Sequence, residues 1–282
     1  MPGTLYLVAT PIGNLEDVTL RAVRILEEVR LIAAEDTRRT GKLLRHYGIS
    51  TPSTSLHDHN ERRRTPGLVK RLLDGDSIAL LSDAGTPLVS DPGFNLVRQS
   101  LDAGVRVAAV PGPSAVTAAL VSSGAPVASF TFLGFPPRGL NDRKRWCDEL
   151  AREPRTLVFF ESPHRLVTTL GLLEERLGER TVALCRELTK LHESTLVGPV
   201  PALLRSVGTP RGEYTCVVWP AARDAGAPPP RPAGPALLDE LDGTTVDGGS
   251  RRDAVKALAA RYGLSARAMY RALEEAKGET GP

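Results

Sequence analysis

The chain has 282 residues, of which 41% are hydrophobic and 24% charged, and its formal net charge is +3. This length predicts about two domains with buried cores, and the mildly basic balance permits a nucleic-acid partner without requiring one. The three cysteines, Cys147, Cys185 and Cys216, exclude a disulfide framework and a CxxC metal or redox pair. No stretch approaches the roughly 20 apolar residues of a membrane span, so we expect a cytoplasmic protein with no membrane partner.

Short apolar runs alternate with helical patterns over the first 112 residues. The runs at 5–9, 31–34, 78–81 and 105–110 read as strands, and most are closed by Gly- or Pro-containing turns. Continuous apolar strands that alternate with helices are typical of a parallel sheet covered on both faces. We therefore predict an N-terminal α/β domain over residues 1–116.

The second half of the chain has a different succession of strand and helix patterns. Its last strand patterns follow one another with little helix between them, which indicates a mixed sheet with antiparallel pairs. We predict a second α/β domain over residues 117–220. Its strands are expected at 130–135, 155–160, 181–186, 194–197 and 214–219, and its helices at 142–152 and 163–177.

A Pro-rich linker at 221–235 is expected to lead into a small helical tail at 236–282. Ser250 and Asp253 have the spacing of a capping box, Gly263 can end that helix, and Ser265 can cap another. The pattern resembles a helix-turn-helix, but a helical hairpin that docks on its own protein gives the same pattern. Both interpretations stay open.

Several common sites are absent from the sequence. It contains no GxxxxGK[ST] phosphate loop, no GxGxxG after its first strand and no GxSxG nucleophile elbow. His57 and His59 could hold a metal, but an HxH pair in a polar loop more often belongs to a hydrogen-bonded turn. We therefore expect no metal site.

Three loops of small residues, at 10–14, 82–93 and 111–114, follow predicted strands. Ligands of open α/β sheets bind at the carboxyl ends of strands, where small residues let them approach the backbone. Asp83 could bind ribose hydroxyls or an ammonium group, and Ser114 begins a predicted helix. These loops favour a ligand site, although turns commonly contain the same residue types.

Several longer motifs lie at or near the ends of the predicted strands. They are LYLVATPIGNLED (5–17), AEDTR (34–38), HDHNE (57–61), SDAGTPLVSDPG (82–93), VPGPSA (110–115), FLGFPPR (132–138), FESPHR (160–165) and RELTK (186–190). In these motifs the sequence resembles the tetrapyrrole-methylase superfamily of S-adenosylmethionine enzymes, and within it the ribosomal RNA small-subunit methyltransferase I family of cytidine 2′-O-methyltransferases. Porphyrin-type relatives usually have Gly-Asp-Pro where this chain has DAGTP at 83–87, which favours the RNA branch.

The resemblance implies a homodimer of two α/β domains whose cleft binds S-adenosyl-L-methionine, without a metal. It implies 2′-O-methylation of a cytidine in the decoding region of 16S ribosomal RNA within the small ribosomal subunit. Alternatives are a methyltransferase of the same fold that acts on a porphyrin or corrin, and a non-catalytic RNA-binding protein. Carried over by position, the donor-binding residues are Pro11, Asp83, Ala84, Gly85, Thr86, Val89, Ser114, Ala115, Phe160, Arg186 and Tyr214.

A ribose hydroxyl is a weak nucleophile, so a general base or hydrogen-bonding groups should assist the transfer. The candidates are Glu35, Asp36, Glu161, Glu187 and Lys190, and each carboxylate could instead serve in a cap or an ion pair. A lysine could act as a base only if its pKa were lowered. Basic clusters at 38–45, 62–64, 138–145 and 251–271, the third beside Trp146, are expected to contact RNA.

Overall fold

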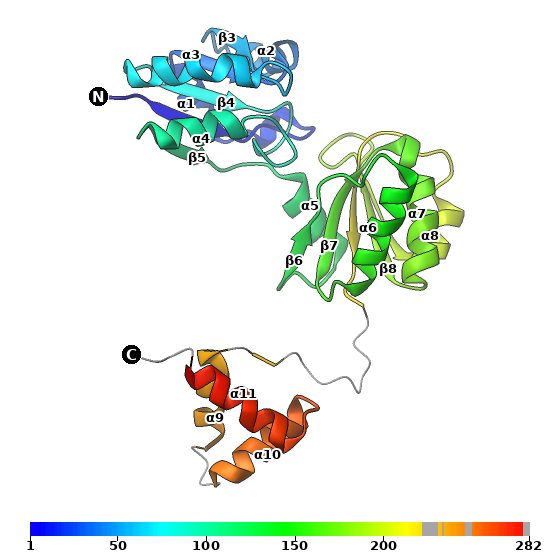
Figure 1. Ribbon diagram of the computed structural model, residues 1–282. Helices are drawn as coiled ribbons and strands as arrows, with labels where there is room; N and C mark the ends of the chain where they lie inside the picture. The colour runs from blue at the N-terminus through cyan, green and yellow to red at the C-terminus, as the bar shows by residue number, and fades with distance from the viewer. Residues whose placement is uncertain (222–230, 233, 246–249, 279–282) are drawn as a thin grey trace. The chain divides into compact units, whose positions relative to one another are not determined.

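The computed structural model describes residues 1–221, 231–232, 234–245 and 250–278, so most of the expected linker lies outside the described residues. The chain divides into two compact units, Met1–Ala221 and Ala222–Pro282. The first unit contains two five-stranded sheets, and the described residues of the second contain helices as their only regular elements (Figure 1). Among the described residues, no helix is long and apolar enough to cross a membrane.

The first sheet has the strand order β3-β2-β4-β1-β5 and is parallel throughout, as the sequence predicts. Strands β2 and β4 are buried along their whole length, which explains their continuous apolar runs. The edge strand β3 was missed because its sequence, Ser-Thr-Ser, carries no apolar signal. The strands are β1 (Thr4–Val8), β2 (Leu31–Ala34), β3 (Ser53–Ser55), β4 (Ile78–Leu81) and β5 (Arg106–Val110).

Helices cover both faces of this sheet. One apolar cluster contains residues of α1 and α2, and a second cluster on the other face contains residues of α3 and α4. A short 3₁₀ turn at Leu15–Asp17 precedes α1. The helices are α1 (Leu20–Glu28), α2 (Thr37–His46), α3 (Glu61–Leu73) and α4 (Phe94–Asp102).

The second sheet has the order β6-β7-β10-β8-β9, with β6 and β7 parallel and the other pairs antiparallel, as the sequence predicts. Helices α6, α7 and α8 pack on one face, while α5 packs on the other. The strands are β6 (Phe130–Phe132), β7 (Thr156–Glu161), β8 (Thr181–Arg186), β9 (Ser194–Pro199) and β10 (Tyr214–Val218). The helices are α5 (Ala115–Ser123), α6 (Leu140–Arg152), α7 (Pro163–Leu177) and α8 (Val200–Ser206).

The described part of the second unit contains the helices α9 (Pro235–Thr245), α10 (Arg251–Arg261) and α11 (Ala266–Gly278), which share one apolar core. The predicted caps form: the hydroxyl of Ser250 accepts a hydrogen bond from the amide of Asp253 at 3.2 Å, and Ser265 caps α11 through the amide of Ala268. The sequence did not predict α9. Because α9 completes the core, the tail is a three-helix unit rather than a bare hairpin.

Candidate functional site

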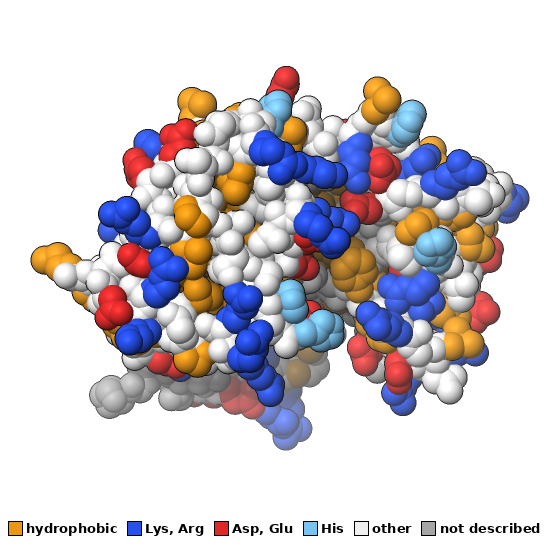
Figure 2. Space-filling view, turned by 90° about the horizontal axis from the view of Figure 1, so that it is seen from above, with side chains coloured by type: hydrophobic (Ala, Val, Ile, Leu, Met, Phe, Trp, Pro, Cys, Tyr) orange, Lys and Arg blue, Asp and Glu red, His pale blue; other side chains and the backbone are white. Residues whose placement is uncertain are grey.

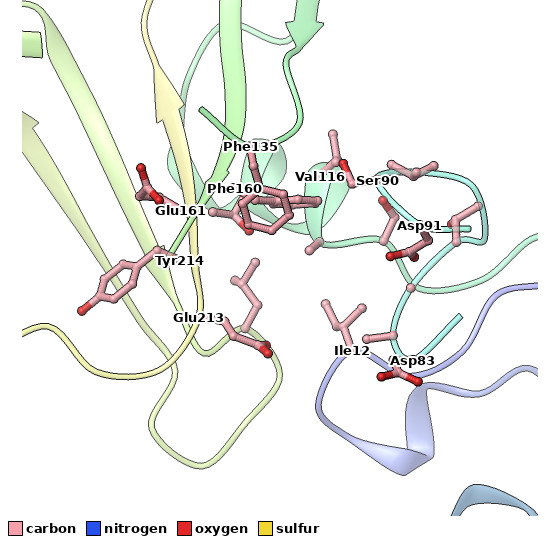
Figure 3. Close-up of a pocket in the computed structure, with 18 of the residues that line it drawn as sticks. Ile12, Asp83, Ser90, Asp91, Val116, Phe135, Phe160, Glu161, Glu213 and Tyr214 are labelled. Atoms are coloured by element: carbon pink, nitrogen blue, oxygen red, sulfur yellow. The ribbon is translucent and has the colours of Figure 1, made fainter. Parts of the chain in front are cut away.

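A cavity of about 400 Å³ lies between the two sheets, at the carboxyl ends of the strands of the first sheet. This volume is within the usual range for a small-molecule site. In Figure 3, Ile12, Asp83 and Asp91 from the first sheet's loops face Phe160 and Glu213 from the second sheet across the cavity. Both sheets therefore contribute to one site.

Most of the residues proposed for donor binding line this cavity. Two do not: Pro11 lines a smaller cavity next to it, and Arg186 donates from Nε to the carbonyl oxygen of Arg211 at 2.8 Å. The residues that the structure brings together are Asp83, Ala84, Gly85, Thr86, Val89, Ser114, Ala115, Phe160 and Tyr214.

The loop at 82–93 is tied to the loop after β1. Thr10 and Gly85 exchange two backbone hydrogen bonds of 2.9 Å, and Gly85 has a φ of +78° that glycine adopts without strain. Leu88 and Ser90 also have positive φ, at 70° each, which costs each of them about 1–3 kcal/mol. The surrounding structure therefore holds this loop in an unusual shape at the cavity wall.

Three carboxylates gather on the first-sheet side of the cavity. The Glu35 carboxylate accepts from the amide of Asp83 at 3.2 Å, and Arg39 pairs with Asp83 at 3.3 Å. Burial raises the pKa of Glu35; the hydrogen bond from the Asp83 amide opposes this effect, and the negative charge of Asp83 adds to it. Burial raises the pKa of Asp91 to about 6, although a hydrogen bond with Ser82 opposes this effect. The wall therefore favours a positively charged ligand group.

Aromatic rings form the opposite wall. Phe160, near the end of β7, lies 5.4 Å from Phe135 and 5.0 Å from Phe132 between ring centroids. The backbone amide of Phe160 donates to the carbonyl of Gly134 at 2.8 Å, which holds the loop of Phe135 beside β7. These rings offer an apolar surface against which a flat heterocycle can pack.

The carboxylate of Glu161, one of the candidate bases, is taken up by an ion pair and hydrogen bonds within the protein. Its buried carboxylate pairs with Arg165 at 2.7 Å and accepts hydrogen bonds from the Thr169 hydroxyl at 2.6 Å and the Ser162 amide at 2.8 Å. Arg165 also donates to the carbonyl of Pro136 at 3.2 Å. Through Arg165, the Glu161 carboxylate therefore holds the segment next to Phe135 in the aromatic wall.

Of the five candidate bases, Glu35 and Glu161 line the cavity, and only Glu35 lacks a buried ion-pair partner there. The side chain of Asp36 caps α2, and hydrogen bonds from Arg38 hold its pKa well below its usual range. Glu187 and Lys190 form an ion pair at 3.0 Å outside the cavity lining.

The surroundings of Lys190 raise its pKa, whereas a lysine that acts as a base needs a lowered pKa. Burial alone would raise the pKa of Glu187, but the amide of Glu213 and the ammonium of Lys190 lower it. Burial alone would lower the pKa of Lys190, but hydrogen bonds to Glu213 and Glu187 raise it. Lys190 therefore holds its proton more tightly than a free lysine does, which opposes a role as a base.

Several lining residues were not singled out from the sequence. Asp91 and Phe135 fall inside quoted motifs, so their segments were identified but their roles were not. Ile12 also falls inside a quoted motif, and its role was not predicted either. Glu213 and Leu188 reach the cavity from the loops that flank β8 and β10, and nothing in the sequence alone indicated that Glu213 would line it.

Two of the residues expected to contact RNA are engaged within the protein and are not free to bind RNA. Arg143 is 5% exposed and donates to the carbonyls of Pro137 and Arg138, while Trp146 packs edge-on against Phe159 with ring centroids 5.2 Å apart. Other Lys and Arg side chains gather on the face in Figure 2, around the hollow between the two sheets. Arg38, Arg39, Lys42 and Arg45 share α2, as expected.

The His57-Asp58-His59 segment forms a turn. The side chain of Asn60 accepts from the His57 amide at 3.0 Å, and its amide nitrogen lies 3.0 Å from His57 Nε2. Within the described ranges, no group of three or more His, Cys, Asp and Glu side chains is arranged to hold a metal ion.

Comparisons with known proteins identify related sequences. Residues 4–204 match the family model of Tetrapyrrole (Corrin/Porphyrin) Methylases. The chain is 45% identical over 274 residues to a ribosomal RNA small subunit methyltransferase I from Synechocystis sp., covering 95% of this chain and 96% of that protein. The protein of the same name from Pasteurella multocida is 53% identical, with 73% of each chain covered.

A solved structure shares the fold. The uroporphyrin-III C-methyltransferase of Thermus thermophilus, solved as a complex with S-adenyl homocysteine, matches 77% of this chain and 97% of its own. The TM-score is 0.56 and the sequence identity is 21%. This likeness concerns the arrangement of the two α/β sheets.

Proposed function

Because this chain belongs to the tetrapyrrole methylase family and, within it, to the ribosomal RNA small subunit methyltransferase I family, we propose that it methylates small-subunit ribosomal RNA with S-adenosyl-L-methionine as donor. The observation that carries the proposal is the 45% identity to a protein of that name over 95% of this chain. For the acceptor we propose the 2′-hydroxyl of a cytidine in 16S ribosomal RNA, as the motif resemblance implies.

The residues of the cavity fit such a donor. Its volume of about 400 Å³ is sufficient for a small nucleoside derivative, and Phe135 and Phe160 offer a surface for the adenine ring. Glu35, Asp83 and Asp91 favour the positive charge of the sulfonium. The first amides of α5, at Ala115 and beyond, have no partner within their own helix and can bind the donor's carboxylate or ribose.

The chemistry requires alignment more than activation of the donor. The donor supplies a methyl group on a positively charged sulfur. The acceptor oxygen forms a bond to this carbon as the carbon–sulfur bond breaks, and the sulfur keeps the electron pair. The hydroxyl proton must go to a base, and we assign this role to Glu35, whose raised pKa makes it a better proton acceptor than an ordinary glutamate. Holding both partners in line supplies most of the acceleration.

We further propose a cytoplasmic homodimer. Support for the dimer comes from β9, an edge strand of the second sheet on which Leu196 and Val197 are 42% and 50% exposed. An edge strand has unpaired backbone groups that can pair with another chain, and its exposed apolar side chains would be buried by such pairing. Light scattering of the purified protein at micromolar concentration tests this, and a monomeric mass would contradict it.

The experiment for the proposed activity uses methyl-labelled S-adenosylmethionine and small ribosomal subunits from a strain that lacks the gene. Nucleoside analysis should recover the label in 2′-O-methylcytidine. The variant Asp83→Asn should lose donor affinity and transfer together, while Asp74→Asn, at the exposed end of α3, should behave as the wild type. Label on a tetrapyrrole but not on RNA would refute the RNA assignment.

A further inference from the structure

A second, smaller cavity of about 160 Å³ adjoins the donor cavity. We call it the side cavity. Arg39 and Asp83 line both cavities, so the two are separated only by this ion pair and its neighbours. The other side-cavity residues come from the loop after β1, from α2 and from the end of β4, and include Pro11, Leu15, Thr40, Lys42 and Leu43.

The size and lining of the side cavity suit one aromatic ring. A cavity of about 150 Å³ is known to hold a benzene molecule, so this one can take a pyrimidine but not the whole donor. Pro11, Leu15 and Leu43 present apolar surface. Thr40 adds a hydroxyl group that can hydrogen-bond the polar edge of a base, whereas the Thr10 hydroxyl already donates to the carbonyl of Ser82 at 3.3 Å.

The rim of the side cavity is positively charged. Arg39 and Lys42 lie on the exposed surface of α2. Arg39 is 65% exposed in its pair with Asp83, and such a pair contributes only about 0–1 kcal/mol, so a phosphate can replace the carboxylate as its partner. In the described part of the chain, no carboxylate oxygen lies within 4.0 Å of the Lys42 ammonium.

We propose that the side cavity binds the target nucleotide of the RNA. The unstacked base enters the cavity, and Lys42 and Arg39 bind the flanking phosphates. Enzymes that act on a base atom take the target nucleotide out of the stack, and here the same extrusion would hold the ribose in place through its base. The shared wall at Asp83 then brings the ribose beside the donor cavity. This inference rests on the proposed function and assigns its acceptor site.

The first test fills the side cavity. Leu15 is 36% exposed, so Leu15→Trp should fold and place an indole where the base would bind. Its matched control is Leu20→Trp, at a side chain that is 90% exposed and outside both cavities. Leu15→Trp should reduce transfer to small subunits by about 100-fold or more, with the Kd for S-adenosylhomocysteine unchanged. Transfer at the control rate, or an equal loss of donor affinity, would overturn the proposal.

The second test removes the rim charge. Lys42→Ala should raise the KM for small subunits by about tenfold and leave the donor Kd unchanged, and the dependence of KM on salt should become shallower. The control Lys70→Ala makes the same charge change on α3, which packs on the opposite face of the sheet from α2. Equal effects of the two variants would refute a specific contact at Lys42.

The two hypotheses can fail separately. If the wild type transfers no methyl group to small subunits, the proposed function fails, and the acceptor site falls with it. If the wild type is active and both side-cavity variants match their controls, only the acceptor site is refuted.

Discussion

Replacing Asp91 with asparagine should stabilise the protein at neutral pH. Burial first, and then the nearby charges of Glu35 and Asp83, raise the pKa of the Asp91 carboxyl from 3.8 to about 6, against the hydrogen bond with Ser82. The folded protein therefore binds this proton more tightly than the unfolded chain does. The resulting stabilisation is complete below about pH 4 and is lost as the pH rises through about 6.

The magnitude follows from that pKa difference. A pKa difference of about 2 corresponds to about 3 kcal/mol, and solvent screening at this partly exposed side chain reduces the expected effect to about 1 kcal/mol. The Asn side chain keeps the shape and carries no charge. Asp91→Asn should therefore gain about 1 kcal/mol over the wild type at neutral pH, and this gain should shrink towards pH 4.

Urea unfolding followed by circular dichroism, at about pH 4.5 and about pH 7.5, measures this difference. Asp74→Asn is the control because it removes a carboxylate from the exposed end of α3, away from the cavity. A stability difference between Asp91→Asn and the wild type that is the same at both pH values would refute the reasoning. It would mean that Asp91 is as well solvated in the folded state as in the unfolded chain.

Three further predictions concern the buried ion pair of Glu161, the aromatic wall of the cavity and the core of the three-helix unit. Glu161→Gln leaves the charge of Arg165 without its buried partner and should cost about 3 kcal/mol in urea unfolding; an unchanged midpoint would contradict this. Phe160→Ala should weaken the Kd of S-adenosylhomocysteine about tenfold in calorimetry, whereas Phe130→Ala, outside the cavity, should not; equal affinities would remove Phe160 from the donor site. Leu258→Ala should destabilise the three-helix unit by about 3 kcal/mol, seen as lost helical dichroism, and any loss of donor affinity would show that the first unit depends on the second.

The sequence predicted best those elements whose burial leaves a continuous apolar pattern. The strand at 181–186 and the helix at 163–177 match β8 and α7 at both ends. The strand β3 and the helix α9 were missed for different reasons. Strand β3 is short and polar and is held by pairing with β2. Helix α9 follows a Pro-rich segment and buries only a few side chains, such as Leu237 and Leu241.

The site was predictable more fully on the side of the first sheet, although Phe160 and Tyr214 of the second sheet were also singled out and line the cavity. Loops that follow parallel strands must meet at one edge of a sheet, so the first sheet's contribution could be read from the chain. The second sheet contributes through the end of β7 and the start of β10, where consecutive residues line the cavity together. The sequence cannot show which strand ends of this sheet lie against the first sheet. Arg186 and Tyr214 are partners in the register of β8 and β10, yet only Tyr214 lines the cavity, and the Arg186 side chain donates to the carbonyl of Arg211.

Within residues 1–221, the chain crosses from the first sheet to the second once, between the end of β5 and α5, which packs on the second sheet. The loop after β1 also touches the loop after β8, because a Cβ at Gly13 would collide with the side chain of Lys190. A donor held by Asp83 on one side and Phe160 on the other would act as an additional bridge between two bodies that share a single covalent hinge. Bound donor should therefore merge the melting of the two sheets into one transition, and the spent donor should leave only as the sheets move apart. The turnover rate would then be tied to the stiffness of that hinge, Pro111-Gly112-Pro113, as much as to the chemistry in the cavity.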